Sequence, residues 1–200
     1  MNPLDTIKGT LLAGLVLAVA LAAVAGSHTG LNIDVLVRWL HIAAGIAWIG
    51  LLYYFNFVQV PALAAAAADK GGPGGAGITK YVAPRALLWF RWAAVVTWLS
   101  GALYLLNKGW LLGAFTLGLA GQPGPFNNAI GIGAWLGTIM IFNVWVLIWP
   151  NQKKILGIVP ATDEQKAKAR RTAFLASRTN TLLSIPMILF MAAATHGLPF

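Results

Sequence analysis

The feature that most constrains this chain is a series of apolar segments, each about as long as the roughly 20 residues with which an α-helix crosses a bilayer. Four are nearly uninterrupted, and a fifth is broken only by polar residues near its start and by Pro186. Without water, the backbone N–H and C=O groups of such segments must pair within a helix. We therefore expect an all-α, polytopic transmembrane bundle of about five spanning helices. The expected spans within this single integral membrane domain, residues 1–200, are 7–26, 33–60, 86–106, 130–149 and 173–195.

The composition agrees with a lipid bilayer as the main partner. Hydrophobic residues make up 58% of the chain and charged residues only 10%, whereas soluble domains carry about 25% charged residues. The net charge of +9 comes from lysines and arginines that cluster between the apolar segments. This distribution is typical of membrane proteins, so we expect no nucleic-acid partner.

The connections between the spans predict the orientation of the chain. Basic residues concentrate in the connections 69–85 and 151–171, and the other connections carry few charges. Because lysine and arginine stay on the cytoplasmic side, we expect a cytoplasmic N-terminus and an outside C-terminus, as in a multi-pass protein of a bacterial inner membrane. The first span is expected to be an uncleaved, lipid-facing anchor. The apolar run 110–121 is too short to span and predicts a re-entrant or surface helix.

The histidines all fall toward the expected outer face. His41 lies about 10 Å inside the second span, at 1.5 Å per residue from Val35, His196 ends the fifth span, and His28 lies in the loop after the first. On facing helices, His41 and His196 can ligate haem b, hold a metal ion or relay protons. Haem b is favoured, because the porphyrin supplies the equatorial ligands and two axial histidines suffice. A closed metal site needs three or four protein ligands.

The neighbours of His41 fit the haem hypothesis. Arg38 lies one turn outward on the same helix face, where it can pair with the haem propionates. Small residues such as Gly45 leave room for a flat macrocycle. Ionisable residues inside a membrane are usually functional. Alternatively, His41 hydrogen-bonds a neighbouring helix, His196 is solvated and the small residues serve helix packing.

A second group of polar residues falls in the expected inner leaflet. It contains arginines and asparagines without a nearby carboxylate, namely Arg91, Asn143, Arg178 and Asn180. Such a group predicts a site for an anionic or hydrogen-bonding substrate. The equally weighted alternative is that the arginines reach lipid phosphates while the asparagines tie helices together.

Several motifs of the spans resemble the membrane domain of PuuD-type urate hydroxylases. They are "WLHIAAGIAWIGLLYYFNF", "ALLWFRWAAVVTWLSG", "GAWLGTIMIFNVWVLIWPNQKK" and "ASRTNTLLSIPM", and the resemblance covers residues 33–196. In that family a cytochrome c domain follows the membrane domain, and the activity is oxidation of urate to 5-hydroxyisourate. The resemblance implies electrons leaving through haem, with His41 as the matching ligand position. The chain has no cysteine, hence no c-type haem attachment, so the cytochrome c is expected to be a separate protein.

Three functions remain open at this point. The leading one is a membrane oxidoreductase or electron-transfer protein that binds haem b and passes electrons to an external cytochrome c. Its enzymatic activity is uncertain, and urate as substrate rests on the resemblance alone. The second is a non-catalytic accessory subunit of a respiratory or other membrane complex. The third, a small transporter or channel, is disfavoured because the sequence shows neither inverted repeats nor an acidic coupling residue within a span.

Overall fold

The computed structural model describes residues 2–26, 32–121 and 127–198, which form helices and turns without any strand. The chain divides into two compact units, Met1–Ile33 and Asp34–Phe200. In the first, a single turn of 3-10 helix precedes α1, Ile7–Ala25. Thr6 caps α1, because its hydroxyl accepts a hydrogen bond from Gly9 N at 3.0 Å. Apolar residues surround α1 on all sides, as expected for a helix that faces lipid.

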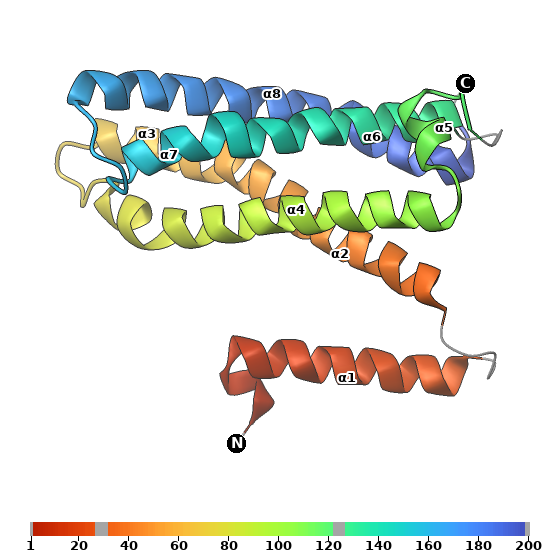
Figure 1. Ribbon diagram of the computed structural model, residues 1–200. Coiled ribbons are helices and arrows are strands. Elements are labelled where there is room, and N and C mark those ends of the chain that lie inside the picture. Colours follow the sequence, from red (N-terminus) through yellow and green to blue (C-terminus); the bar gives the residue numbers. More distant parts are fainter. Residues whose placement is uncertain (1, 27–31, 122–126, 199–200) are drawn as a thin grey trace. The chain divides into compact units, whose positions relative to one another are not determined.

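The second unit contains the other helices, which run back and forth along its length (Figure 1). Its α-helices are α2 (Ile33–Tyr53), α3 (Val60–Ala68), α4 (Ala83–Asn107), α5 (Leu111–Phe115), α6 (Asn127–Phe142), α7 (Trp149–Ile155) and α8 (Asp163–His196). Three π-helical segments, Tyr54–Gln59, Ile78–Val82 and Asn143–Ile148, continue directly into α3, α4 and α7.

The predicted number of spans is confirmed among the described residues. The helices long and apolar enough to cross a membrane are Ile7–Ala25, Ile33–Ala68, Ile78–Asn107, Asn128–Ile155 and Asp163–His196. The chain is thus an all-helical, multi-pass membrane protein. Four of these helices are longer than the sequence predicts. The expected short helix in 110–121 is α5, which lies against α6 through a hydrogen bond from Trp135 Nε1 to Phe115 O at 3.1 Å.

Prolines explain why three of these helices are longer than the predicted spans. Pro61, Pro84 and Pro150 each lie in the first turn after a π-helical segment. Proline lacks an N–H, and its ring clashes with the carbonyl one α-helical turn earlier. The wider π turn leaves room for that ring, and its i→i+5 pattern includes the bond from Val60 N–H to Phe55 O. The helices therefore pass through these prolines instead of ending there.

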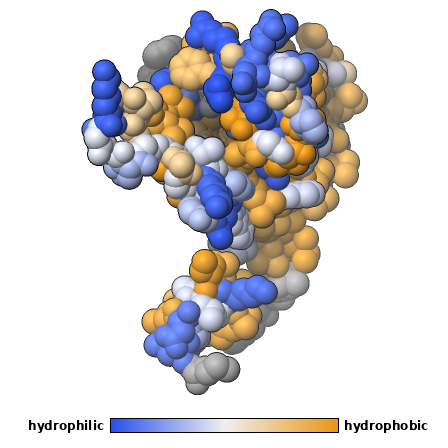
Figure 2. All heavy atoms as spheres, turned by 90° about the vertical axis from the view of Figure 1, so that its left-hand side faces the viewer, coloured by the Kyte–Doolittle hydropathy of each residue, from blue (hydrophilic) through white to orange (hydrophobic). Residues whose placement is uncertain are grey.

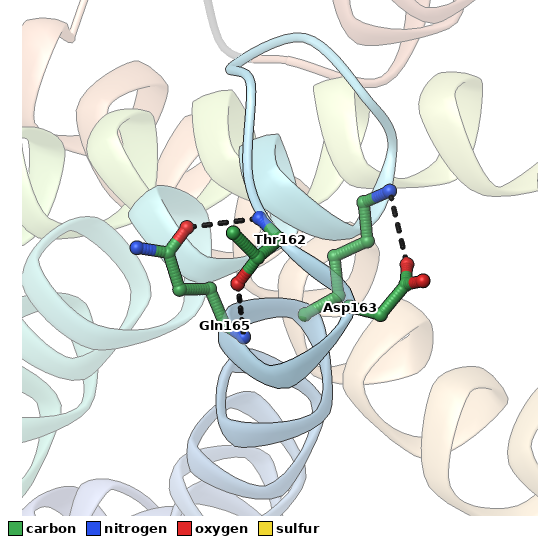
Figure 3. A network of polar contacts seen from close by, with 4 residues as sticks. Thr162, Asp163 and Gln165 are labelled. Carbon is green, nitrogen blue, oxygen red and sulfur yellow. Dashed lines mark hydrogen bonds and ion pairs between the residues drawn. The ribbon is translucent and has the colours of Figure 1, made fainter.

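The bundle core is apolar and is tied by a few polar contacts. Its largest fully buried apolar side chains belong to α2, α4, α6 and the third π segment: Trp48, Leu52, Phe90, Met140 and Val144. α8 begins with a capping box (Figure 3). In it, Thr162 Oγ1 accepts from Gln165 N at 3.2 Å, and Gln165 Oε1 accepts from Thr162 N at 2.9 Å. These bonds satisfy N–H groups that the first turn of a helix otherwise leaves unpaired.

The two ends of the second unit differ in chemistry. We call the end with Arg38, Asn107 and His196 the histidine end, and the end with the links 69–77 and 156–162 the basic end. Figure 2 views the basic end and shows hydrophilic side chains gathered there, beside apolar flanks. At the histidine end, Lys108 Nζ and Asp34 Oδ2 form an ion pair at 2.6 Å that joins α2 to the end of α4.

Candidate functional site

A cavity of about 890 Å³ opens at the histidine end, between α2, α4, α5, α6 and α8. This volume lies within the roughly 300–1,000 Å³ that is usual for small-molecule and cofactor sites. Its walls are mostly apolar and contain several glycines. At Gly50 and Gly137 an added Cβ would find no atom within 4 Å, so the cavity is open beside both. All four residues predicted to bind the cofactor line this cavity: Arg38, His41, Gly45 and His196.

The His41 ring is held in a defined orientation. Its Nδ1 lies 2.8 Å from Thr97 O on α4. A carbonyl oxygen can only accept, so Nδ1 carries the proton and donates it. In the neutral ring, Nε2 is then left with a free lone pair, the form in which histidine ligates metals. The ring also lies against Gly101, where an added Cβ would come within 2.8 Å of His41 Cε1.

His41 and His196 lie equally far along their helices from a contact between α2 and α8. Tyr53 on α2 and Ser184 on α8 are hydrogen-bonded at 2.9 Å. His41 precedes Tyr53 by twelve residues, and His196 follows Ser184 by twelve on the antiparallel helix. At 1.5 Å per residue, both histidines are about 18 Å from this contact. His196 is the exposed last residue of α8, and Arg38 is also exposed, so the cavity is polar at its mouth.

The residues predicted to bind substrate do not form one group. Asn143 Nδ2 donates to Asn180 Oδ1 at 2.8 Å, and Asn180 Nδ2 donates to Met140 O at 3.0 Å. The two asparagines therefore tie the third π segment and α6 to α8. Arg178 is only two residues from Asn180 and points to the opposite side of the helix, where it is exposed.

Arg91 is in a different situation from Arg178. It is only 8% exposed, so its side chain is held inside the bundle and does not extend along the surface. Its guanidinium carbon lies 3.4 Å from the centre of the Trp149 ring of α7. Its Nε is buried and has no hydrogen-bond partner among the described residues.

Sequence reasoning identified the histidines but missed what positions them. Thr97 contributes only its backbone carbonyl to His41, which no side-chain pattern reveals. Gly101 provides space for the ring, and the only signal was a small residue in the middle of an apolar span. No group of three or more potential metal-ligating side chains occurs in the described ranges. His28 lies outside the described residues.

Comparison with known proteins assigns the chain to a family. A family model described as urate oxidase N-terminal matches residues 31–117 and 126–200. The matched segments contain α2 through α8 and every residue that lines the cavity. No curated protein and no solved structure matches the chain. The match covers most of the sequence and agrees with the resemblance to PuuD-type urate hydroxylases, and the chain therefore belongs to the urate oxidase N-terminal family.

Proposed function

We propose that this protein is a haem-b-binding oxidoreductase or electron-transfer protein of a bacterial inner membrane. The observation that carries the proposal is His41. Its ring is fixed by Thr97 O, its Nε2 is free for a metal, and it borders a cavity of about 890 Å³. A histidine that only ties two helices needs neither an adjoining cavity nor a glycine kept clear beneath its ring.

The residues around the cavity fit such a cofactor in kind and in position. His41 and His196 would hold the haem iron in this proposal, since both border the same cavity. Arg38 provides a guanidinium at the mouth for the propionates, because charge-assisted bonds between arginine and carboxylate are among the stronger polar contacts. Gly50 and Gly137 leave space in the cavity walls, which a flat ring requires, and Gly45 lines the same cavity.

Haem b bound here would supply one-electron redox chemistry. The chain's own residues determine the chemical environment of that haem. Thr97 O keeps the proton on Nδ1 of His41 and thereby raises the basicity of Nε2. The apolar lining excludes water from the deep part of the cavity, and the polar mouth at His196 is where an external cytochrome c would approach. Membership in the family makes urate the first substrate to assay.

The experiment is an absorption spectrum, oxidised and dithionite-reduced, of detergent-purified protein expressed with haem available, with a pyridine haemochrome assay. We expect a low-spin haem b signal near one per chain. His41→Ala should abolish this signal, and His196→Ala should weaken it or convert it from low spin to high spin. His28→Ala, the same change at the remaining histidine, should leave it intact. Folded wild-type protein without haem would refute the proposal.

An accessory subunit without its own cofactor is the competing function, and the same preparation separates the two. It predicts colourless protein that copurifies with larger membrane subunits. Equal haem content in wild type, His41→Ala and His196→Ala would show that any haem is held elsewhere, and that the cavity has another occupant.

A further inference from the structure

Arg91 is a buried cation that no acidic side chain of the described residues neutralises. It belongs to α4 on the half of the bundle toward the basic end, and it is 8% exposed. The ion pairs among the described residues join Lys108 to Asp34 and Lys166 to Asp163, so Arg91 takes part in none. Burying an ionised group without a partner costs several kcal/mol. Such a residue persists when something else supplies the missing charge.

A second cation lies at the same aromatic ring. The Nζ of Lys153, on α7, is 6.0 Å from the centre of the Trp149 ring, and the guanidinium carbon of Arg91 is 3.4 Å from it. Lys153 is partly buried and also lacks an ion pair among the described residues. Two like charges around one indole repel each other. Their arrangement is favourable once an anion lies between or beside them.

The stacking on Trp149 also determines how Arg91 can bind. A guanidinium that lies over an aromatic face presents its N–H groups in the plane parallel to that ring. These groups donate no hydrogen bond to a described residue, and Nε is buried. A planar fork with free donors matches the paired oxygens of a phosphate or carboxylate. The acids of the basic end, Asp69, Asp163 and Glu164, are exposed.

We infer that Arg91, Lys153 and Trp149 form a binding site for an oxyanion, a phosphate or a carboxylate, at the basic end and separate from the cavity of the histidines. Arg91 provides the hydrogen-bonding fork, Lys153 the second positive charge, and Trp149 holds the fork in place. The oxyanion comes either from the aqueous phase or from the headgroup of an acidic phospholipid. This inference does not depend on haem binding at the other end.

The test measures thermal unfolding of the full chain reconstituted in nanodiscs of phosphatidylcholine or of phosphatidylglycerol. Inorganic phosphate is titrated against chloride at equal ionic strength. A soluble oxyanion predicts that phosphate, and not chloride, raises the Tm in phosphatidylcholine. A headgroup predicts a higher Tm in phosphatidylglycerol, with little further effect of phosphate. In both cases Arg91→Gln should reduce the rise in Tm. In the phosphate titration its apparent Kd should be weaker on the order of tenfold or more, as expected for losing hydrogen bonds to a charged group.

Matched variants separate the site from general charge effects. Arg171→Gln and Lys80→Gln remove the same charges from exposed residues that also lie near aromatic rings, of Phe174 and Tyr81, and should respond as wild type does. Lys153→Gln tests the site in a partly exposed residue, in case Arg91→Gln does not fold. The inference is overturned if wild type responds to neither phosphate nor phosphatidylglycerol. It is equally overturned if the folded Arg91 or Lys153 variants respond fully.

Discussion

Gly101→Ala tests the position of the His41 ring with one added methyl group. The new Cβ would lie 2.8 Å from His41 Cε1 and 2.9 Å from its Nδ1. Ordinary carbon contacts are about 3.5–4.0 Å, so the ring must move by roughly 0.7 Å or more. The hydrogen bond from Nδ1 to Thr97 O, now 2.8 Å, then approaches the limit of about 3.5 Å beyond which it is no longer a hydrogen bond. Losing it costs about 1 kcal/mol.

The controls for this variant are Gly14→Ala and Gly77→Ala. Both glycines are helical, neither lines the cavity, and an added Cβ at either would have no atom within 4 Å. All three variants gain the same helix propensity, so their difference isolates the contact with His41. We measure the Tm and the haem content of each purified protein. Gly101→Ala should be less stable than the controls by about 1 kcal/mol, and its affinity for haem about fivefold weaker. If it matches the controls in both measurements, the ring does not lie where we place it.

Two further predictions concern the polar ties of the bundle. Asn180→Ala leaves Asn143 Nδ2 unpaired in the core and removes the side-chain bond to Met140 O, so the free energy of unfolding in denaturant should fall by roughly 1–3 kcal/mol; a neutral result would mean that the network is not needed. The Asp34 carboxylate raises the pKa of Lys108 above its ordinary value of 10.5. This stabilisation is present below pH 10.5 and is lost as the pH rises through the raised pKa. The Tm advantage of wild type over Asp34→Asn should therefore disappear in strongly alkaline buffer, and a constant advantage would contradict the ion pair.

The sequence was sufficient for the class of fold and for the number of spans, because length and apolar composition alone determine which segments can cross a bilayer. It was not sufficient for the helix ends. The expected spans stop at Val60 and Trp149, each directly before a proline, whereas the helices continue to Ala68 and Ile155. A proline normally ends a helix, and nothing in the local pattern shows that the turn before it widens.

The grouping of residues at the histidine end was predictable, because a single side chain carries each signal. Arg38, His41, Gly45 and His196 were expected together, and they line one cavity. The inner group was harder, because whether two polar residues meet depends on the rotation of each helix about its axis. Arg178 and Asn180 are neighbours in sequence, yet one is exposed and the other fully buried. The pairing of Arg91 with Trp149 joins different helices and had no local signature.

The hydrogen bond between Tyr53 and Ser184 joins α2 to α8 at one point, about which the two helices can rotate relative to each other. Ser184 Oγ donates to Thr181 O at 2.7 Å, so the Tyr53 hydroxyl is the donor in its bond to Ser184. Each histidine lies about 18 Å along its helix from this contact. Each degree by which one helix rotates about the contact would therefore change the separation of the histidines by about 0.3 Å. A small rearrangement deep in the bundle is thereby amplified at the mouth of the cavity. Substitutions far from His41 and His196 can thus tune the distance between these two residues, and with it the geometry of whatever they hold.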